Sequence, residues 1–163
     1  MAKTEISTLG EFGLIKHLTK DFPTRQPSTQ KSVGDDAAVM NFGAQRTLIT
    51  TDLLLEGIHF NLEYAPLKHL GYKAAVVNFS DIYAMNATPT QITVSLGISK
   101  RFSVEDLEEL YAGIRLACEK YNVDLVGGDT SASMTGLTIS ITCLGTAYDS
   151  DIVYRDGAKV NDL

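Results

Sequence analysis

The apolar residues of this chain change repeatedly between helical and strand spacing, and this alternation limits the fold more than any other feature. Residues 67–81 carry apolar side chains three or four positions apart, whereas residues 91–98 alternate as a strand does. Such signals predict helices at 5–20, 66–84 and 104–118, and strands at 37–40, 46–51, 91–98, 123–126 and 138–145. This order predicts an α+β domain in which helices cover one side of a mixed four-stranded sheet.

The segment before the first predicted strand is expected to be a loop. Residues 22–32 are mostly polar and include two prolines. The strands 37–40 and 46–51, with a turn-like segment between them, predict a hairpin. Antiparallel pairing would then bring Asp36, at the start of the hairpin, close to Asp52, at its end.

Local signals also define the helix ends. Pro66 suits the first position of a helix, where its missing N–H costs little. Asn86 tolerates the left-handed conformation that often ends a helix. Ser103, with Asp106 three residues later, predicts the N-cap of the next helix.

Size and charge exclude several classes of protein. The chain has 163 residues, enough for one full domain and the start of another. A net charge of −6 argues against a nucleic-acid partner held through phosphate contacts. No apolar run approaches the roughly 18 residues of a membrane span, so no membrane association is expected. The first residues lack the apolar core of a signal peptide, which favours the cytoplasm.

The two cysteines are predicted to be buried free thiols. Cys118 falls on the apolar face of a predicted helix, and Cys143 falls in an apolar strand far along the sequence. A disulfide is less expected in a cytoplasmic protein.

Four aspartates, each in a short motif, are the strongest chemical signal: Asp36, Asp52, Asp81 and Asp129. Mg²⁺ prefers oxygen ligands and commonly bridges to the phosphates of a nucleotide. Carboxylates gathered in one place would repel each other without a metal. The joint pattern therefore predicts a Mg²⁺–nucleotide site. The alternative for any one of them is a turn or cap residue, since Asp beside Gly or Ser is ordinary turn chemistry.

The motifs, taken in order, resemble a known family. They are Gly34-Asp35-Asp36-Ala37-Ala38, Thr50-Thr51-Asp52, Gly57-Ile58-His59-Phe60, residues 73–85, and Gly127-Gly128-Asp129-Thr130. The set is similar to the N-terminal, ATP-binding domain of thiamine-monophosphate kinase. The wider superfamily includes aminoimidazole ribonucleotide synthetase and selenophosphate synthetase. Tyr83 and Asn86 depart from the family's usual helix sequence, although neither is an expected metal ligand.

This resemblance implies a domain arrangement and an assembly. Residues 1–148 would form the N-terminal ATP- and Mg²⁺-binding domain, which dimerises as the two sheets close into a barrel-like interface. Residues 91–98 and 138–143 are candidates for that interface, and the ATP site could borrow residues from the partner chain. Residues 149–163 have the composition of a linker and would lead into a truncated C-terminal domain.

The resemblance also implies an activity. ATP would phosphorylate thiamine monophosphate to thiamine diphosphate by direct in-line transfer, without a phosphoenzyme. Such transfer depends on positioning and charge neutralisation, here by several Mg²⁺ ions, so no catalytic side chain is assigned.

Residue roles carry over by position in the motifs. The implied metal ligands are Asp36, Thr50, Thr51, Asp52, Asp81 and Asp129. The implied nucleotide-binding residues are Gly128, Asp129, Arg155 and Tyr111, and His59 matches a substrate contact. A half-buried structural histidine is the alternative for His59. Simple helix packing is the favoured alternative for Tyr111.

Two other functions stay open. The protein could be another ATP-dependent member of the superfamily with a different acceptor, because acceptor recognition would lie largely in the second domain. Residues 1–33 have no Cys and little Gly, which counts against selenophosphate synthesis. The chain by itself could also be a non-catalytic metal-binding and dimerisation module.

Overall fold

A computed structural model describes residues 4–33, 39–40, 45–154 and 159–161. Its helices are α1 (Gly10–Thr19), α2 (Leu67–Ala84) and α3 (Val104–Tyr121), with short 3₁₀ turns at Ile6–Thr8 and Asp149–Asp151. Its strands are β1 (Thr29–Lys31), β2 (Val39–Met40), β3 (Arg46–Leu55), β4 (Thr88–Ile98), β5 (Asp124–Ala132) and β6 (Thr138–Ala147).

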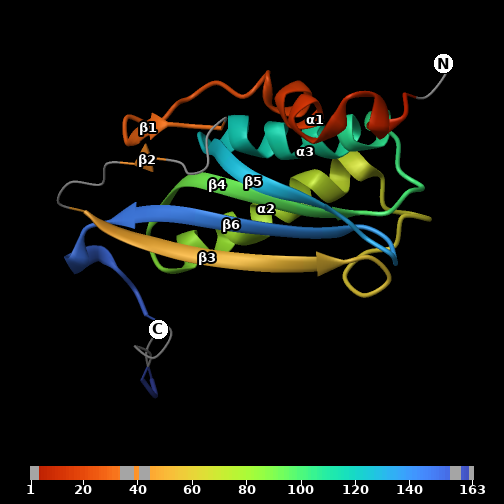
Figure 1. The fold of residues 1–163 in the computed structure, drawn as a ribbon. Coiled ribbons are helices and arrows are strands. Elements are labelled where there is room, and N and C mark those ends of the chain that lie inside the picture. The colour runs from red at the N-terminus through yellow and green to blue at the C-terminus, as the bar shows by residue number, and fades with distance from the viewer. Residues whose placement is uncertain (1–3, 34–38, 41–44, 155–158, 162–163) are drawn as a thin grey trace.

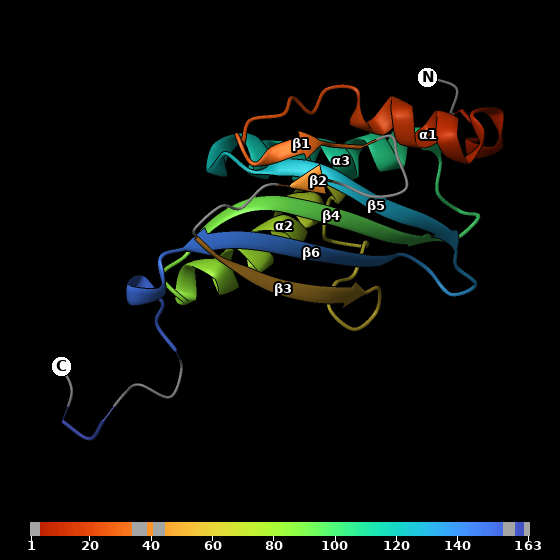
Figure 2. The same ribbon diagram turned by 60° about the vertical axis from the view of Figure 1, so that its left-hand side comes forward.

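The main sheet has four strands in the order β3-β6-β4-β5. β4 and β5 are parallel, and β6 runs antiparallel to both β3 and β4. α2 and α3 cover one face of this sheet, and α1 packs on α3 (Figures 1 and 2). The predicted fold class, a mixed four-stranded sheet with helices on one side, is confirmed.

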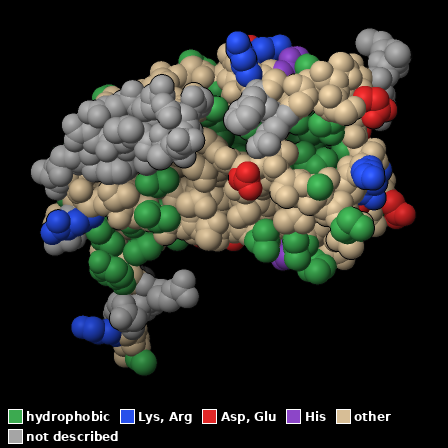
Figure 3. All heavy atoms as spheres, in the orientation of Figure 1, with side chains coloured by type: hydrophobic (Ala, Val, Ile, Leu, Met, Phe, Trp, Pro, Cys, Tyr) green, Lys and Arg blue, Asp and Glu red, His purple; other side chains and the backbone are tan. Residues whose placement is uncertain are grey.

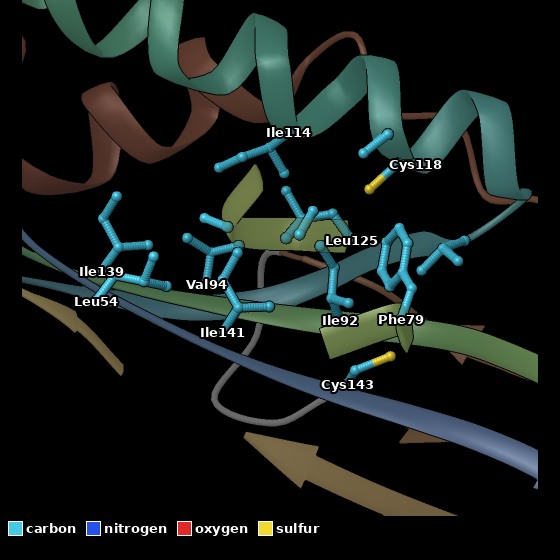
Figure 4. Close-up of a cluster of buried hydrophobic side chains, with 14 of the residues drawn as sticks. Leu54, Phe79, Ile92, Val94, Ile114, Cys118, Leu125, Ile139, Ile141 and Cys143 are labelled. Carbon is cyan, nitrogen blue, oxygen red and sulfur yellow. The ribbon is translucent and has the colours of Figure 1, made fainter. Parts of the chain in front are cut away.

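The core lies between the sheet and the two long helices (Figure 4). Strand residues that face the helices alternate with residues on the opposite face, as the pleat of a sheet requires. Cys118 on α3 and Cys143 on β6 both point into this core as buried free thiols, as predicted. Burial raises the pKa of each thiol to about 12, so neither is a nucleophile at neutral pH.

The two long helices approach each other until their backbones touch. A Cβ atom added at Gly71 of α2 would lie 2.0 Å from the carbonyl oxygen of Leu110. One added at Gly113 of α3 would lie 1.9 Å from the carbonyl oxygen of Lys68. Any larger side chain at either glycine would push the helix layer apart.

The predicted N-cap of α3 and the left-handed residue after α2 are confirmed, whereas Pro66 is the N-cap of α2 rather than its first residue, and the first helix begins at Gly10 rather than at residue 5. Ser103 caps α3 in a capping box with Asp106, and α3 ends at Asn122 in the left-handed conformation. Pro66 precedes the first residue of α2, and Asn86 follows its end with a φ of 56°. Capping depends on local geometry, which explains why the sequence predicts it well.

The predicted hairpin is wrong. β2 pairs with β1, and β3 pairs with β6 rather than with the strand that precedes it. β1 falls within the segment predicted to be a loop. Tertiary contacts hold this segment, since the buried Asp124 carboxylate accepts hydrogen bonds from the backbone of Arg25 and Gln26 and from the hydroxyl of Thr29.

The strands of the main sheet are longer than predicted, and two of the extensions include predicted site residues. β3 continues to Leu55 and β5 to Ala132, so Asp52 and Asp129 lie inside strands. Asp81 lies inside α2. None of these three aspartates is a turn residue, so ordinary turn chemistry does not account for them.

In the described part of the chain, no helix covers the opposite face of the sheet (Figure 1). It presents Ile49 and Leu53 of β3, which are 68% and 52% exposed, beside alternate residues of β6 such as Thr142 and Leu144. Viewed from this side, the described surface carries few charged side chains and scattered hydrophobic ones (Figure 3).

In the part of the chain that the structure describes, the helices are too short or too polar to cross a lipid bilayer.

Candidate functional site

β3 and α2 bring two of the predicted aspartates to one place. Thr50 and Asp52 lie two residues apart on β3, so both side chains face α2. The hydroxyl of Thr50 donates a hydrogen bond to Oδ2 of Asp81, at 2.8 Å. The fully buried Asn78 accepts from the backbone N–H of Asp52 at 3.0 Å and donates to the carbonyl of Ala74 at 3.0 Å. Asn78 thereby fixes the strand to the helix beside the aspartates.

The carboxylates of Asp52 and Asp81 repel each other. Burial raises the pKa of Asp52, the negative charge of Asp81 raises it further, and His59 opposes both effects. The repulsion would be relieved by a bound cation. Carboxylate and hydroxyl oxygens are the donors that Mg²⁺ prefers, so the residues present fit that ion.

The described residues supply only part of a metal centre. Within residues 4–33, 39–40, 45–154 and 159–161, no three Asp, Glu, His or Cys side chains are gathered as a metal site would need. Asp36 and Arg155 lie outside the described residues, so their predicted roles stay predictions.

Thr51 is not brought to the aspartate pair. Its side chain lies on the opposite face of the sheet, where its hydroxyl donates to the carbonyl of Ile141 and accepts from Thr142, both at 3.1 Å. The alternation of side chains along a strand separates Thr51 from Thr50 and Asp52. That alternation was available in the sequence and is the signal that would have separated them.

Asp129 and Gly128 lie across the sheet from Asp52. One row of paired residues consists of Asp52, Ile141, Val94 and Gly128. Three strand spacings separate the ends of such a row, about 14 Å. Asp129 belongs to the next row, beside Ser95, and therefore projects to the open face of the sheet. Within one chain, the sheet holds Asp129 apart from Asp52 and Asp81.

Gly128 has a structural reason to be glycine. A Cβ atom there would lie 1.8 Å from the carbonyl oxygen of Val94 on β4. β5 could not pair so closely with β4 if this residue carried a side chain. This requirement holds whether or not Gly128 also binds a phosphate.

Tyr111 is a packing residue in this structure. Its ring on α3 is buried and meets the ring of Phe22 edge-on, with centroids 6.4 Å apart. Burial raises its pKa to about 12. The arrangement matches the favoured alternative, simple helix packing, and the contact with Phe22 joins α3 to the N-terminal segment.

His59 lies in the segment between β3 and α2, and its side chain is exposed. The backbone N–H of Leu55 donates to its Nδ1 atom at 3.0 Å. Because Nδ1 accepts this bond, the proton of the neutral ring is on Nε2, which is then available as a donor. A backbone contact therefore orients this side chain on the surface.

Sequence reasoning missed two basic residues near His59. A cavity of about 390 Å³ opens beside this loop, and its lining includes His69 and Lys73 from α2. Their spacing of four residues places them on one helix face, and this is the signal that could have found them.

These features define the class of protein. The chain belongs to the family of the AIR synthase related protein, N-terminal domain, because the model of that family matches residues 34–147.

The named relatives of this chain have a narrower description than the family as a whole. The chain is 36% identical over 163 residues to the thiamine-monophosphate kinase of Synechococcus elongatus, covering 99% of this chain and 48% of that protein. It thus spans about half the length of the curated relatives it matches.

Solved structures agree with this. A thiamine-monophosphate kinase from Stenotrophomonas maltophilia superposes with a TM-score of 0.76 at 29% identity, covering 93% of this chain and 46% of that one. AaThiL complexed with AMPPCP and TMP superposes with a TM-score of 0.66 at 34% identity, covering 98% of this chain and 48% of that one.

Proposed function

We propose that this chain is the ATP- and Mg²⁺-binding part of an enzyme that phosphorylates thiamine monophosphate to thiamine diphosphate. The observation that carries the proposal is the mutually repelling pair of Asp52 and Asp81, held by Thr50 and Asn78. The similarity to thiamine-monophosphate kinases, one of them bound to AMPPCP and TMP, supports the choice of substrates.

The residues of this site would act by binding and positioning. Asp52 and Asp81 would hold Mg²⁺, which when bound neutralises phosphate charge. Thr50 orients the carboxylate of Asp81, and Asn78 fixes the strand that carries Asp52. No side-chain nucleophile is needed for direct in-line transfer between phosphates.

A homodimer would complete the arrangement. The open sheet face exposes Ile49 and Leu53, and a second copy could cover them and the edge of β3. Asp129 projects from the same face, so a dimer would bring it to the interface. The predicted barrel-like dimer, with a nucleotide site that borrows from the partner, is part of the proposal.

Residues 149–163 would then connect this domain to a second one, and the enzyme would be cytoplasmic. Both statements are proposals that follow from the family.

A second candidate is favoured by one observation. The described residues gather only two carboxylates, and the chain spans half of its relatives. Alone, the chain would then be a metal-binding and dimerisation module without turnover. Another ATP-dependent superfamily member with a different acceptor is the remaining alternative.

The test is formation of thiamine diphosphate from thiamine monophosphate, ATP and Mg²⁺, using the protein expressed with whatever its gene encodes beyond Leu163. Asp52→Asn is expected to lower kcat by about 10³-fold or more, because the site would lose a ligand of the Mg²⁺ that neutralises the phosphate charge. Asp21→Asn is the matched control, since Asp21 makes only an exposed ion pair with Arg115.

Near-normal turnover in Asp52→Asn would remove the metal assignment. If no product forms but ATP still binds in a Mg²⁺-dependent manner, the acceptor is another substrate of the superfamily.

A further inference from the structure

The cavity beside His59 is lined by basic side chains in an otherwise acidic chain. It is lined by residues of the loop that follows β3 and of the first two turns of α2. Among the described residues, the lining includes the ammonium group of Lys73 and the imidazole rings of His59 and His69, and no Asp or Glu. The chain as a whole has a net charge of −6. A cavity with this lining favours an anion.

The start of α2 adds to this preference. The N-terminal end of a helix carries partial positive charge from its unpaired N–H groups. The first turn of α2 contains no acidic residue to cancel that charge. His69 lies in this turn and Lys73 one turn later, on the same side of the helix.

Lys73 also holds the loop that supports His59. Its Nζ donates to the carbonyl oxygen of His59 at 3.2 Å. An ammonium group has three N–H donors, so two remain for a ligand. The loop is further tied by the hydrogen bond from Gly57 N–H to the carbonyl of Phe60, at 2.8 Å. Hydrogen bonds therefore fix Lys73 and the His59 loop relative to each other, and His69 lies beside them in the cavity lining.

The cavity adjoins the aspartate pair. His59 lies near enough to Asp52 to act on its charge. Along α2, Lys73 and Asp81 are eight residues apart, which is about 12 Å of helix. An acidic group suited to Mg²⁺ and a basic group suited to a phosphate thus follow one another along β3 and α2.

We propose that Lys73 and His69, together with His59, form the subsite that binds the phosphate group of the acceptor. This rests on the proposed function, in which a phosphate monoester accepts a phosphoryl group. The ring of thiamine carries a positive charge that these residues would repel, so the phosphate end fits here and the ring would point away. Lys73 then has two roles, direct contact with the phosphate and support of the His59 loop.

The first test compares Lys73→Met with Lys68→Met in the protein extended beyond Leu163. Lys68 is an exposed lysine of the same helix outside the cavity lining, so it matches the loss of charge. Lys73→Met is expected to raise KM for thiamine monophosphate about 10-fold or more, while KM for ATP stays within about 2-fold. Lys73→Arg should restore most of the affinity, because it keeps the charge. An unchanged KM for the acceptor, or equal increases for both substrates, would overturn the proposal.

The second test does not require turnover. Inorganic phosphate, without Mg²⁺ or ATP, is titrated into the same protein while the ring resonances of His59 and His69 are followed by NMR. Saturable shifts that Lys73→Met abolishes and Lys68→Met preserves support the subsite, even if thiamine monophosphate is not the substrate. Absence of saturable shifts in the wild type would overturn the subsite, even if the enzyme phosphorylates thiamine monophosphate.

Discussion

Asp124 and Asp52 both lie on strands of the same sheet, yet they meet opposite electrostatic surroundings. Asp124 is only 2% exposed and accepts three hydrogen bonds, from two backbone N–H groups and the hydroxyl of Thr29. Asp52 is half-buried, and its carboxylate faces the negative charge of Asp81. The Asp124 carboxylate has hydrogen-bond donors within the fold. The Asp52 carboxylate faces a like charge, which a bound cation would offset. On the proposed function, this difference separates a structural aspartate from one that would bind metal.

The largest effect on folding is expected at Asp124. Asp124→Ala would leave three hydrogen-bond donors without their acceptor. We expect a loss of about 3 kcal/mol in the free energy of unfolding. Urea denaturation measures it. Asp124→Asn, which keeps one carboxamide oxygen as an acceptor, should lose less. A loss below about 1 kcal/mol for the alanine variant would contradict the structural role.

Asp52→Asn should have the opposite effect on stability. Because the pKa of Asp52 is raised in the folded state, its charge opposes folding once the pH exceeds the ordinary value of 3.8. Removing that charge should leave stability unchanged or raise it by about 1 kcal/mol or less at pH 7. The gain should disappear near pH 3, where the carboxyl of the wild type is protonated. A clear loss of stability at pH 7 would show that Asp52 is a structural residue after all.

The effect of Mg²⁺ on the melting temperature should also distinguish Asp52 from a carboxylate that binds no metal. Millimolar Mg²⁺ is expected to raise the melting temperature of the wild type by a few degrees, because a ligand that binds only the folded state stabilises it. Asp52→Asn should lose most of this increase, whereas Glu109→Gln, an exposed carboxylate change on α3, should keep it. Differential scanning fluorimetry with and without EDTA is sufficient, and equal increases in both variants would exclude Asp52 as a ligand.

The smallest effect is expected at Glu105, a carboxylate that is matched only in part: its Oε1 accepts from the backbone N–H of Thr4, and its buried Oε2 has no hydrogen-bond partner among the described residues. Its own backbone N–H and that of Thr4 lower its pKa to about 2. The stabilisation is therefore complete above the ordinary pKa of 4.5 and is lost as the pH falls towards 2. The difference in melting temperature between wild type and Glu105→Gln should be small at pH 6 and should vanish near pH 2. A difference that grows in acid would contradict this.

Much of the fold could be predicted because its signals are local. The apolar stripe of α2, the alternation in β4 and the capping box at Ser103 each depend on residues a few positions apart. Strand ends were less predictable. β5 continues through Gly127 and Gly128, which look like a turn, because pairing with β4 stabilises an extended backbone that glycine alone does not favour.

The sequence predicted which residues belong to the site, and the structure shows which of the described ones lie close together. Thr50, Asp52 and Asp81 come together, whereas Thr51 turns to the other face and Tyr111 packs in the core. The basic cavity was missed because its members come from a loop and a helix whose contact is not visible in linear spacing.

By itself, the sequence determined the three helices, the four strands of the main sheet, the capping box of α3 and the motifs that relate this chain to its family. These depend on interactions between residues close in the chain. Only the tertiary structure decided that β1 pairs with β2, that Asp129 is held across the sheet from Asp52, and that Lys73 supports His59. Those contacts join distant segments, and their energy depends on which faces pack together, which no local pattern specifies.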